Sequence, residues 1–286
     1  ALISVDLQQM ASDKNAEDKA GMLKSLLHVD DVDKCGIDIS EKLYLFESAD
    51  GNLGLCAKVS DEGDVEDWLA SLAKKRIASE VKERKGFHFA VLKDSWLVGF
   101  SGQALLVMGP VVADAQAQLQ QQMVKYLKAE EEDGITVSPM YERLQTLSSP
   151  MAMVAQAQAL PEKFIAPFTL GAPKDTDPSQ VVIAADMEVK DGILQIQGET
   201  FSFNETIDKA LQKAAQNYRP IKGSYVKSMP GDALAGIFMN VNGEQFLPMM
   251  QSNRSLQTLL MGINQAVDMD NIMRSVDGDM AIVLPT

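Results

Sequence analysis

Short runs of alternating apolar and polar residues recur along the chain, and several of them lie between a turn and a helix. The fullest example is 229–241, where Pro230, Gly231 and Asp232 favour a turn before an apolar strand, and a helix over 244–250 follows. Residues 1–7 show the same strand pattern without its turn, and a similar strand is expected over 151–157. The pattern therefore predicts three related strands at intervals along the chain.

Two hairpins with Asp-Gly turns divide the chain in a similar way. Strands are predicted over 42–47 and 53–59 and again over 180–189 and 193–201, and each hairpin precedes an amphipathic helix. The first helix is expected to be capped near Gly63-Asp64 and the second by Asn204. The other predicted helices cover 13–27, 113–129, 138–147, 161–168, 255–267 and 269–275, and the other predicted strands 87–92, 96–100, 104–108 and 280–284.

This order of elements predicts an α+β fold made of repeated β-helix-β-β-helix units. We expect antiparallel sheets with helices packed on one face, because Asp-Gly hairpins connect neighbouring strands directly. Two domains are predicted, a first repeat domain over 1–149 and a second over 150–286 that includes a partial third unit. The alternative is an α+β architecture without repeats, in which the similar hairpins are coincidental.

One uncharged segment, 95–113, is long enough to cross a membrane. Ser101-Gly102-Gln103 lies at its middle, and Gly99, Gly109 and Pro110 interrupt it. Turn residues at these places favour a buried hairpin over a membrane span.

Composition bounds the class of partner. The chain has 286 residues, 46% hydrophobic and 23% charged, with a net charge of −14. These proportions are typical of a globular protein, and the negative surface repels nucleic acid and anionic lipid. We therefore expect no nucleic-acid partner, and membrane association only through a covalent lipid.

Cys35 and Cys56 are the only cysteines, which excludes a disulfide scaffold. Cys56 lies in an apolar strand, where a buried free thiol is the simpler interpretation, and a Cys35–Cys56 bridge is the alternative. The chain starts at Ala1 without Met and without a signal peptide, so we expect a processed or trimmed chain.

The run from Cys35 to Glu47, together with the strand 53–59 and the helix 65–72, resembles an uncharacterised lipoprotein family of Bacteroidetes, a domain of unknown function. Met229-Pro230-Gly231-Asp232-Ala233 is similar to that family's turn, whereas its lipidated cysteine has no counterpart here. The resemblance implies export and a lipid anchor in the cell envelope, periplasmic or at the outer membrane. It brings no catalytic residues.

No catalytic constellation stands out. The chain has two histidines, of which His28 follows a helix and His88 lies on the strand face opposite Phe87 and Phe89. Ser101 nearly fits a Gly-x-Ser-x-Gly nucleophile motif, but its second glycine comes one residue early and no strand-to-helix turn follows. Phosphate-binding glycine loops are missing from the sequence, so we expect no enzyme activity and no cofactor.

Metal binding is also not expected. Asp268-Met269-Asp270-Asn271 and Asp277-Gly278-Asp279 hint at calcium ligands but lack the order of an EF-hand loop. Helix capping and turn formation explain these carboxylates more simply, and Asp277–Asp279 is expected to form a turn before the strand 280–284. Asp30, Asp31 and Asp33 receive the same interpretation.

Two groups of residues are candidates for contact with a partner. Lys74, Lys75, Arg76, Lys82, Arg84 and Lys85 form the one basic cluster, interpreted as a solvated helix end, with contact to an anionic glycan as the sharper alternative. The chain also has 16 methionines. Met249, Met250 and Met261 are the candidate partner-binding residues, because Met-rich grooves bind varied apolar partners, although helical spacing equally favours a core.

The sequence thus favours a non-enzymatic, envelope-anchored lipoprotein with a binding or structural role and a protein or glycan partner. The alternative is a hydrolase, for glycans or another substrate, that uses acidic residues in a cleft. It predicts a deep cleft lined by two or more acids with raised pKa.

Overall fold

The computed structural model describes residues 1–12, 21, 24–25, 27–28, 31–48, 50–130, 132, 134–160, 165–166, 168–190, 193–231 and 233–285. Packing divides the chain into two compact units. Unit 1 comprises 1–155 with 184–198, and unit 2 comprises 156–183 with 199–286. The predicted domain division between 149 and 150 stays a prediction.

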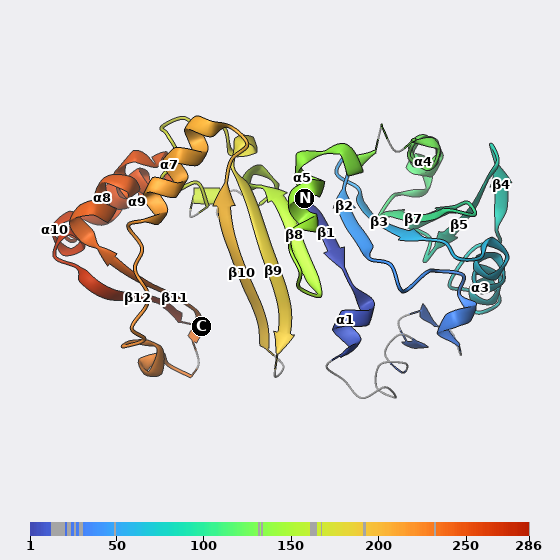
Figure 1. The fold of residues 1–286 in the computed structure, drawn as a ribbon, viewed down its shortest axis with the longest axis horizontal. Helices are drawn as coiled ribbons and strands as arrows, with labels where there is room; N and C mark the ends of the chain where they lie inside the picture. The colour runs from blue at the N-terminus through green and yellow to red at the C-terminus, as the bar shows by residue number, and fades with distance from the viewer. Residues whose placement is uncertain are drawn as a thin grey trace. The chain divides into compact units, whose positions relative to one another are not determined.

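A ten-stranded sheet dominates the fold, in the order β10-β9-β8-β1-β2-β3-β7-β6-β5-β4 (Figure 1). The strand pairs with a described register are all antiparallel, as predicted. The strands are β1 (Leu2–Val5), β2 (Leu43–Glu47), β3 (Leu53–Lys58), β4 (Lys82–Arg84), β5 (Phe87–Leu92), β6 (Trp96–Phe100), β7 (Ala104–Gly109), β8 (Met151–Gln156), β9 (Val182–Lys190) and β10 (Ile193–Phe201). The fold is therefore of mixed α and β type.

The first strand of the chain, β1, is an inner strand of the sheet. It pairs with β2 on one side and β8 on the other, so that Leu2 lies opposite both Phe46 and Val154. Leu2 and Val154 are buried, which explains the apolar alternation at the N-terminus.

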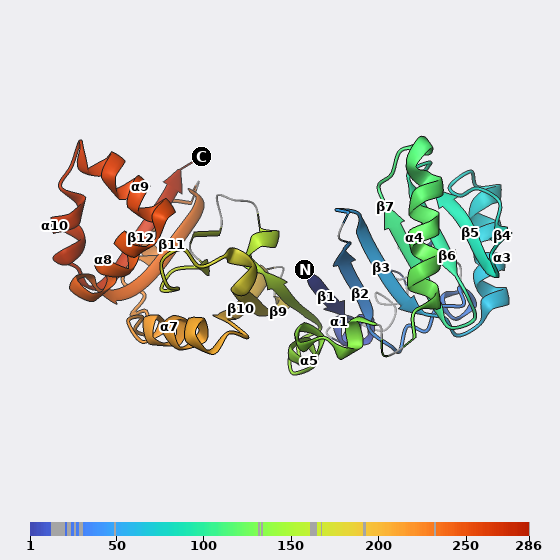
Figure 2. The ribbon, with the colours of Figure 1, turned by 90° about the horizontal axis from the view of Figure 1, so that it is seen from above.

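In unit 1, helices cover both faces of the sheet at β5 and β6, which corrects the predicted packing on one face. The main ones in unit 1 are α3 (Glu62–Lys74) and α4 (Gln116–Lys128); α1 (Leu7–Ser12) and α5 (Pro139–Gln145) are shorter. Leu69 of α3 shares a core with Ala90 and Val98, whereas Met123 of α4 shares one with Phe89 and Leu97. Neighbouring strand residues point to opposite faces, so the two helices lie on opposite sides (Figures 1 and 2). Strands β5 to β7 are largely apolar on both faces, as expected when both faces of a sheet are covered; one covered face would give alternating apolar and polar residues.

The uncharged segment 95–113 forms the β6–β7 hairpin, as predicted. No described helix is long and apolar enough to cross a membrane. The cap of α3 differs from the prediction: it is Asp61, whose carboxylate accepts a hydrogen bond from the Asp64 backbone N–H at 3.0 Å. Asp61 has the extended backbone that a cap requires, whereas Gly63 and Asp64 already belong to the helix.

Unit 2 contains a separate two-stranded antiparallel sheet of β11 (Ala233–Asn242) and β12 (Asp277–Pro285). Its helices are α7 (Glu205–Ala215), α8 (Gly243–Ser252), α9 (Arg254–Asn264) and α10 (Met269–Arg274). Val241, Phe246, Leu247, Leu260 and Met273 form its core. Asp277–Asp279 lies inside β12, opposite Asn240–Asn242, and not in a turn before the strand, because β11 is long enough to pair with it.

Helix α7 follows the sequence prediction closely: Asn204 caps it, and Ile207, Leu211 and Ala214 are its buried residues. A hairpin followed by a capped helix thus occurs twice, as β2-β3-α3 and β9-β10-α7. The larger repeat unit stays a prediction. Most of the helices predicted over 13–27 and 161–168 lies outside the described residues.

The short 3₁₀ helices are η1 (Val32–Lys34), η2 (Ala113–Ala115), η4 (Ile135–Val137), η5 (Ala157–Ala159), η6 (Pro178–Gln180) and η7 (Val226–Ser228).

Candidate ligand-binding groove

A groove with a volume of about 360 Å³ lies between the edge of the sheet and α4, and we call it the α4 groove. Helix α4 packs over β6 and β7 (Figure 2), while β4 and β5 lie beyond it at the end of the sheet. The residues lining the groove are Ser79, Glu80, Lys82, Arg84, Phe89, Ala90, Val91, Leu97, Ala113, Gln116, Ala117 and Gln120.

The floor of the groove is apolar and its two walls are polar. Phe89 and Leu97 in the floor are buried parts of the core beneath α4. Gly99 accommodates the Phe89 ring, because a Cβ there would lie 2.6 Å from Phe89 Cε1. Small alanines and two glutamines form the helix wall, which leaves space that larger side chains would fill.

Strand alternation concentrates positive charge on the groove side of β4. Lys82 and Arg84 lie opposite Phe89 and Phe87 of β5, whereas Glu83 between them lies opposite His88. Residues two apart on a strand share a face, so both cations project toward the groove and Glu83 toward the other side of the sheet. Glu80 is the one carboxylate among the groove residues described.

Hydrogen bonds fix parts of both walls. Arg84 Nη1 donates to Gln120 Oε1 at 3.1 Å, which links β4 to α4. Gln116 Nε2 donates to the Asp94 carbonyl at 3.0 Å, and Ser79 Oγ accepts from the Val91 backbone N–H at 2.9 Å. Within the part of the chain that the structure describes, Lys82 has no hydrogen-bond or ion-pair partner, so its ammonium is available to a ligand.

The predicted basic cluster is thereby divided. Lys82 and Arg84 line the groove, whereas Lys75 Nζ donates to the His28 carbonyl at 3.3 Å. Sequence reasoning singled out the two groove cations but missed Gln116 and Gln120. Their spacing of four in an Ala/Gln-rich helix, which places both amides on one face, was the available signal.

His88 lies on the opposite face of the sheet from Phe89, as predicted. Its Nδ1 is 3.2 Å from Glu62 Oε1 and 3.3 Å from Glu66 Oε1, both on α3, and its ring contacts Phe100 with centroids 5.2 Å apart. Ser101, the near-miss nucleophile, accepts bonds from the backbone N–H groups of Gln103 and Ala104, as a turn residue does.

A second cavity of about 290 Å³ is almost entirely apolar. Both tryptophans of the chain line it, and Trp68 Nε1 donates to the Leu27 carbonyl at 2.8 Å. Its other lining residues are Leu27, His28, Leu72, Ile77, Leu92, Lys93 and Val107. Leu27 and His28 adjoin residues 26, 29 and 30, which lie outside the described part of the chain.

The aspartates considered for calcium bind protein groups. Asp268 caps α10 through the Asn271 N–H, and Asp270 accepts from Gln251 and Asn264. Asp279 accepts from the backbone N–H groups of Lys222 and Ser224, which, with the side chain of Asn240, lower its pKa to about 2. Among the described residues, no group of three His, Cys, Asp or Glu side chains could hold a metal ion.

Met249, Met250 and Met261 do not have equal exposure. Met249 and Met250 are half-buried against the core of unit 2, and Met249 Sδ accepts a hydrogen bond from Asn217 Nδ2 at 2.8 Å. Met261 on α9 is 62% exposed. Of the three candidate partner-binding residues, Met261 therefore has the largest accessible surface.

The segment that carried the family resemblance has a structural role at the start of α3. Gly36 has φ +71°, and a Cβ on it would lie 2.5 Å from the Val65 backbone N. Its carbonyl accepts from the N–H groups of Ser60 and Asp61, just before α3. Cys35 next to it is buried, and both Cys35 and Cys56 are free thiols whose pKa is raised by burial.

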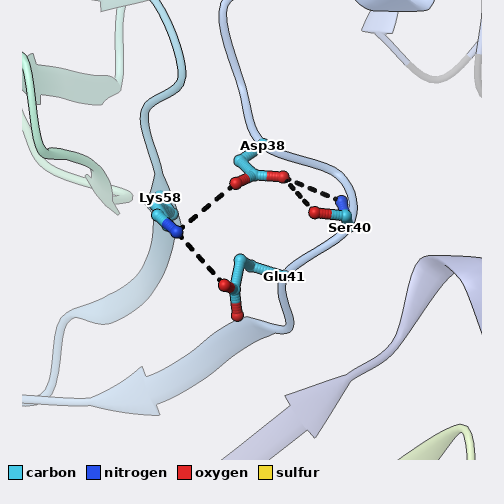
Figure 3. Close-up of polar contacts among 4 residues, drawn as sticks. All are labelled: Asp38, Ser40, Glu41 and Lys58. Carbon is cyan, nitrogen blue, oxygen red and sulfur yellow. Dashed lines mark hydrogen bonds and ion pairs between the residues drawn. The ribbon is translucent and has the colours of Figure 1, made fainter.

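Asp38 completes this corner (Figure 3). Its carboxylate accepts from the Ser40 backbone N–H at 3.1 Å and from Ser40 Oγ at 2.5 Å, and it lies 3.5 Å from Lys58 Nζ. Lys58 also pairs with Glu41 at 3.1 Å. We call the segment Gly36–Glu41 with Lys58 the Gly36 corner. Its polar groups bind each other.

The fold and the groove define an acidic protein with a large antiparallel sheet and two cations, Lys82 and Arg84, on one wall of the α4 groove. The chain belongs to the family described as "Domain of unknown function (DUF4836)", whose model matches residues 6–285. The predicted resemblance to a domain of unknown function is confirmed to that extent; the lipoprotein and Bacteroidetes parts stay predictions.

No curated protein matches the chain. A solved structure titled "Structure of crystal form IV of TP0453" is similar with a TM-score of 0.40 and 12% identity, over 71% of this chain and 76% of that chain. A similarity at this level carries no argument about function.

Proposed function

We propose that the chain is a non-enzymatic binding protein and that its α4 groove binds an acidic glycan. The observation that carries this proposal is the placement of Lys82 and Arg84 on one wall of a groove in a chain whose net charge is −14. Two cations against one carboxylate reverse the sign of the charge locally, and an anionic ligand gains from both.

The chemistry of the walls favours a glycan over a simple anion. Guanidinium and ammonium groups bind carboxylates or sulfates, while the amides of Gln116 and Gln120 can donate to and accept from sugar hydroxyls. Lys82 and Arg84 are two residues apart on a strand, so their Cα atoms are about 7 Å apart. An oligosaccharide with acidic groups along one side can contact both.

Calorimetric titration with an oligogalacturonate, and with a neutral galactose oligosaccharide of equal length, tests the proposal. Arg84→Gln and Lys82→Gln are each expected to weaken oligogalacturonate binding about fivefold to tenfold, because each removes a charge-assisted contact at a partly exposed site. Lys85→Gln changes the net charge equally but lies outside the groove lining, so its affinity should stay close to that of the unmodified chain.

Equal affinity for the acidic and neutral sugars, or an equal loss in Lys85→Gln, would contradict this assignment. Binding that vanishes in all three variants would show only a general charge effect. Cleavage products of the sugar, sought by chromatography after prolonged incubation, would contradict the non-enzymatic part of the proposal.

The hydrolase alternative has no comparable observation in its favour. Of the residues that line the two cavities described, Glu80 is the only carboxylate. Among the acidic residues that the structure describes, Asp38, Asp177 and Asp279 have a shifted pKa, and hydrogen bonds lower it in each, whereas a general acid needs it raised.

We further propose that the protein is exported and held in the cell envelope by an N-terminal lipid, as the sequence resemblance implies. Labelling of the full-length protein with radioactive palmitate in its own cells, followed by envelope fractionation, tests this. Unlabelled protein recovered in the cytoplasmic fraction would contradict it.

A protein partner at the methionine surface of unit 2 remains a separate proposal. Met261→Glu is the sharper test, because Met261 is exposed, whereas Met249→Glu and Met250→Glu would also disturb the core. Loss of a co-purifying envelope protein in Met261→Glu, with the unfolding temperature unchanged, would support it. Retention of that protein would argue against it.

A further inference from the structure

The two outer strands of the ten-stranded sheet differ in length and charge. At one end is β4, three residues long, with the sequence Lys82-Glu83-Arg84. At the other end is β10, nine residues long, whose segment 193–198 has the sequence Ile-Leu-Gln-Ile-Gln-Gly and no charge. Among the described residues, no further strand pairs with the outer side of β10.

Unpaired backbone N–H and C=O groups make an edge strand a template for another strand. Proteins block such edges with short strands, charged side chains, prolines or bulges. β4 has two of these protections, because it is short and every residue in it is charged. The nine-residue β10 is longer, its segment 193–198 contains no charged residue and no proline, and Ile193 and Ile196 are 62% and 60% exposed.

We propose that β10 pairs with β10 of a second copy of this chain, antiparallel, with Ile196 at the twofold axis. In this register Ile196 faces its own copy, Gln195 faces Gln197, and Ile193 faces Glu199. The single charge of the segment 193–199 thereby meets an apolar residue, so no like charges lie opposite each other. Two copies of the segment 193–199 can therefore pair in this register without charge repulsion between opposed side chains.

The pairing gains main-chain hydrogen bonds and buries exposed isoleucine surface. Opposed glutamine side chains add amide hydrogen bonds, and directly opposed β-branched residues pack well across strands. One strand pair buries less area than the roughly 1,600 Å² of a typical stable interface, so we expect a weak, micromolar dimer. The net charge of −14 on each copy opposes association at long range, and salt screens that repulsion.

Sedimentation equilibrium of the full chain, from low micromolar to near-millimolar concentration, tests the proposal. We expect reversible dimerisation that tightens as salt rises. Ile196→Lys should weaken the dimer about tenfold or more, because it puts two lysines opposite each other at the axis. Ile193→Lys is the matched control: the same substitution on the same strand lies opposite Glu199 of the second copy, so no like charges meet and dimerisation should be unchanged.

Both isoleucines are more than half exposed, so both variants should keep the unfolding temperature of the unmodified chain, which thermal circular dichroism checks. A chain that stays monomeric throughout the concentration range overturns the proposal. Equal weakening by Ile196→Lys and Ile193→Lys also overturns it, because that result indicates apolar association without the proposed register. The groove variants should leave dimerisation unchanged, since the α4 groove contains no residue of β10.

Discussion

The Gly36 corner and the α4 groove both contain cations and carboxylates, but the two regions use them differently. At the corner, Asp38 binds Ser40 and Lys58, and the Gly36 carbonyl binds the chain just before α3. In the groove, Lys82 has no partner among the described residues, and the helix wall carries small and amide side chains. Polar groups that satisfy each other hold a fold, whereas polar groups with unused capacity beside a cavity can bind something else.

The largest expected loss of stability comes from a substitution in the Gly36 corner. Gly36→Ala should destabilise the protein by about 3 kcal/mol or more, because a Cβ there would contact Asp61 and Val65 backbone atoms in addition to the cost of a positive φ. Gly86 also has a positive φ of +80°, but a Cβ there meets nothing within 4 Å. Gly86→Ala should therefore cost only about 1 kcal/mol.

Urea unfolding of the two variants gives both free energies. The difference between them isolates the steric contact from the backbone conformation. Similar losses in Gly36→Ala and Gly86→Ala would show that close packing before α3 is not what this segment supplies.

A smaller loss of stability is expected when the Phe89 ring in the groove floor is displaced by the substitution Gly99→Ala. Gly99→Ala would place a Cβ 2.6 Å from Phe89 Cε1 and 3.1 Å from Met123 Cε, and overpacking of this kind costs about 1–3 kcal/mol. Displacement of the Phe89 ring also alters the floor, so oligogalacturonate binding should weaken while folding persists. Unchanged binding in a destabilised Gly99→Ala protein would show that the floor does not shape the site.

Local signals predicted much of the fold. The β2–β3 hairpin with its Asp-Gly turn, the β5–β6 hairpin and the α7 face with Ile207, Leu211 and Ala214 all follow from short-range periodicity and turn chemistry. The second Asp-Gly turn, at 191–192, lies outside the described residues. The strand order did not follow, because the pairing of β1 with β8 depends on residues far apart in sequence. The sequences of β5 to β7 are nearly continuous apolar runs, which indicate burial on both faces. The alternating pattern of the other strands led instead to the prediction of a single covered face.

The groove could be predicted only in part. The basic residues were evident in the sequence, but the sequence favoured a solvated helix end over contact with an anionic glycan. Which of the cations share a face with a cavity depends on the register of Lys82 with Phe89 and on the position of α4, and neither is encoded locally.

Asp279→Asn tests whether unit 2 also contains a carboxylate whose hydrogen bonds to the protein stabilise the fold. The Lys222 and Ser224 N–H groups lower the pKa of Asp279 to about 2, below its ordinary 3.8. A lowered folded-state pKa stabilises the protein above pH 3.8, and that contribution is lost as pH falls toward 2. Asp279→Asn should therefore be less stable at pH 7, and its urea midpoint should change less between pH 4 and pH 2. Parallel curves for the two proteins would contradict this.

The smallest expected effect concerns Asp38 at the corner itself. The Ser40 side chain lowers the pKa of this partly exposed carboxylate, so the contribution of Asp38 to stability is present above pH 3.8 and decreases as pH falls through the lowered pKa. Because Asp38 is solvent-accessible and its pair with Lys58 is screened, Asp38→Asn should reduce stability only slightly at pH 7, and less still in high salt. Urea unfolding at low and high salt measures it. A loss comparable to that of Gly36→Ala would mean that the ion pair, and not the close packing of Gly36, holds the corner together.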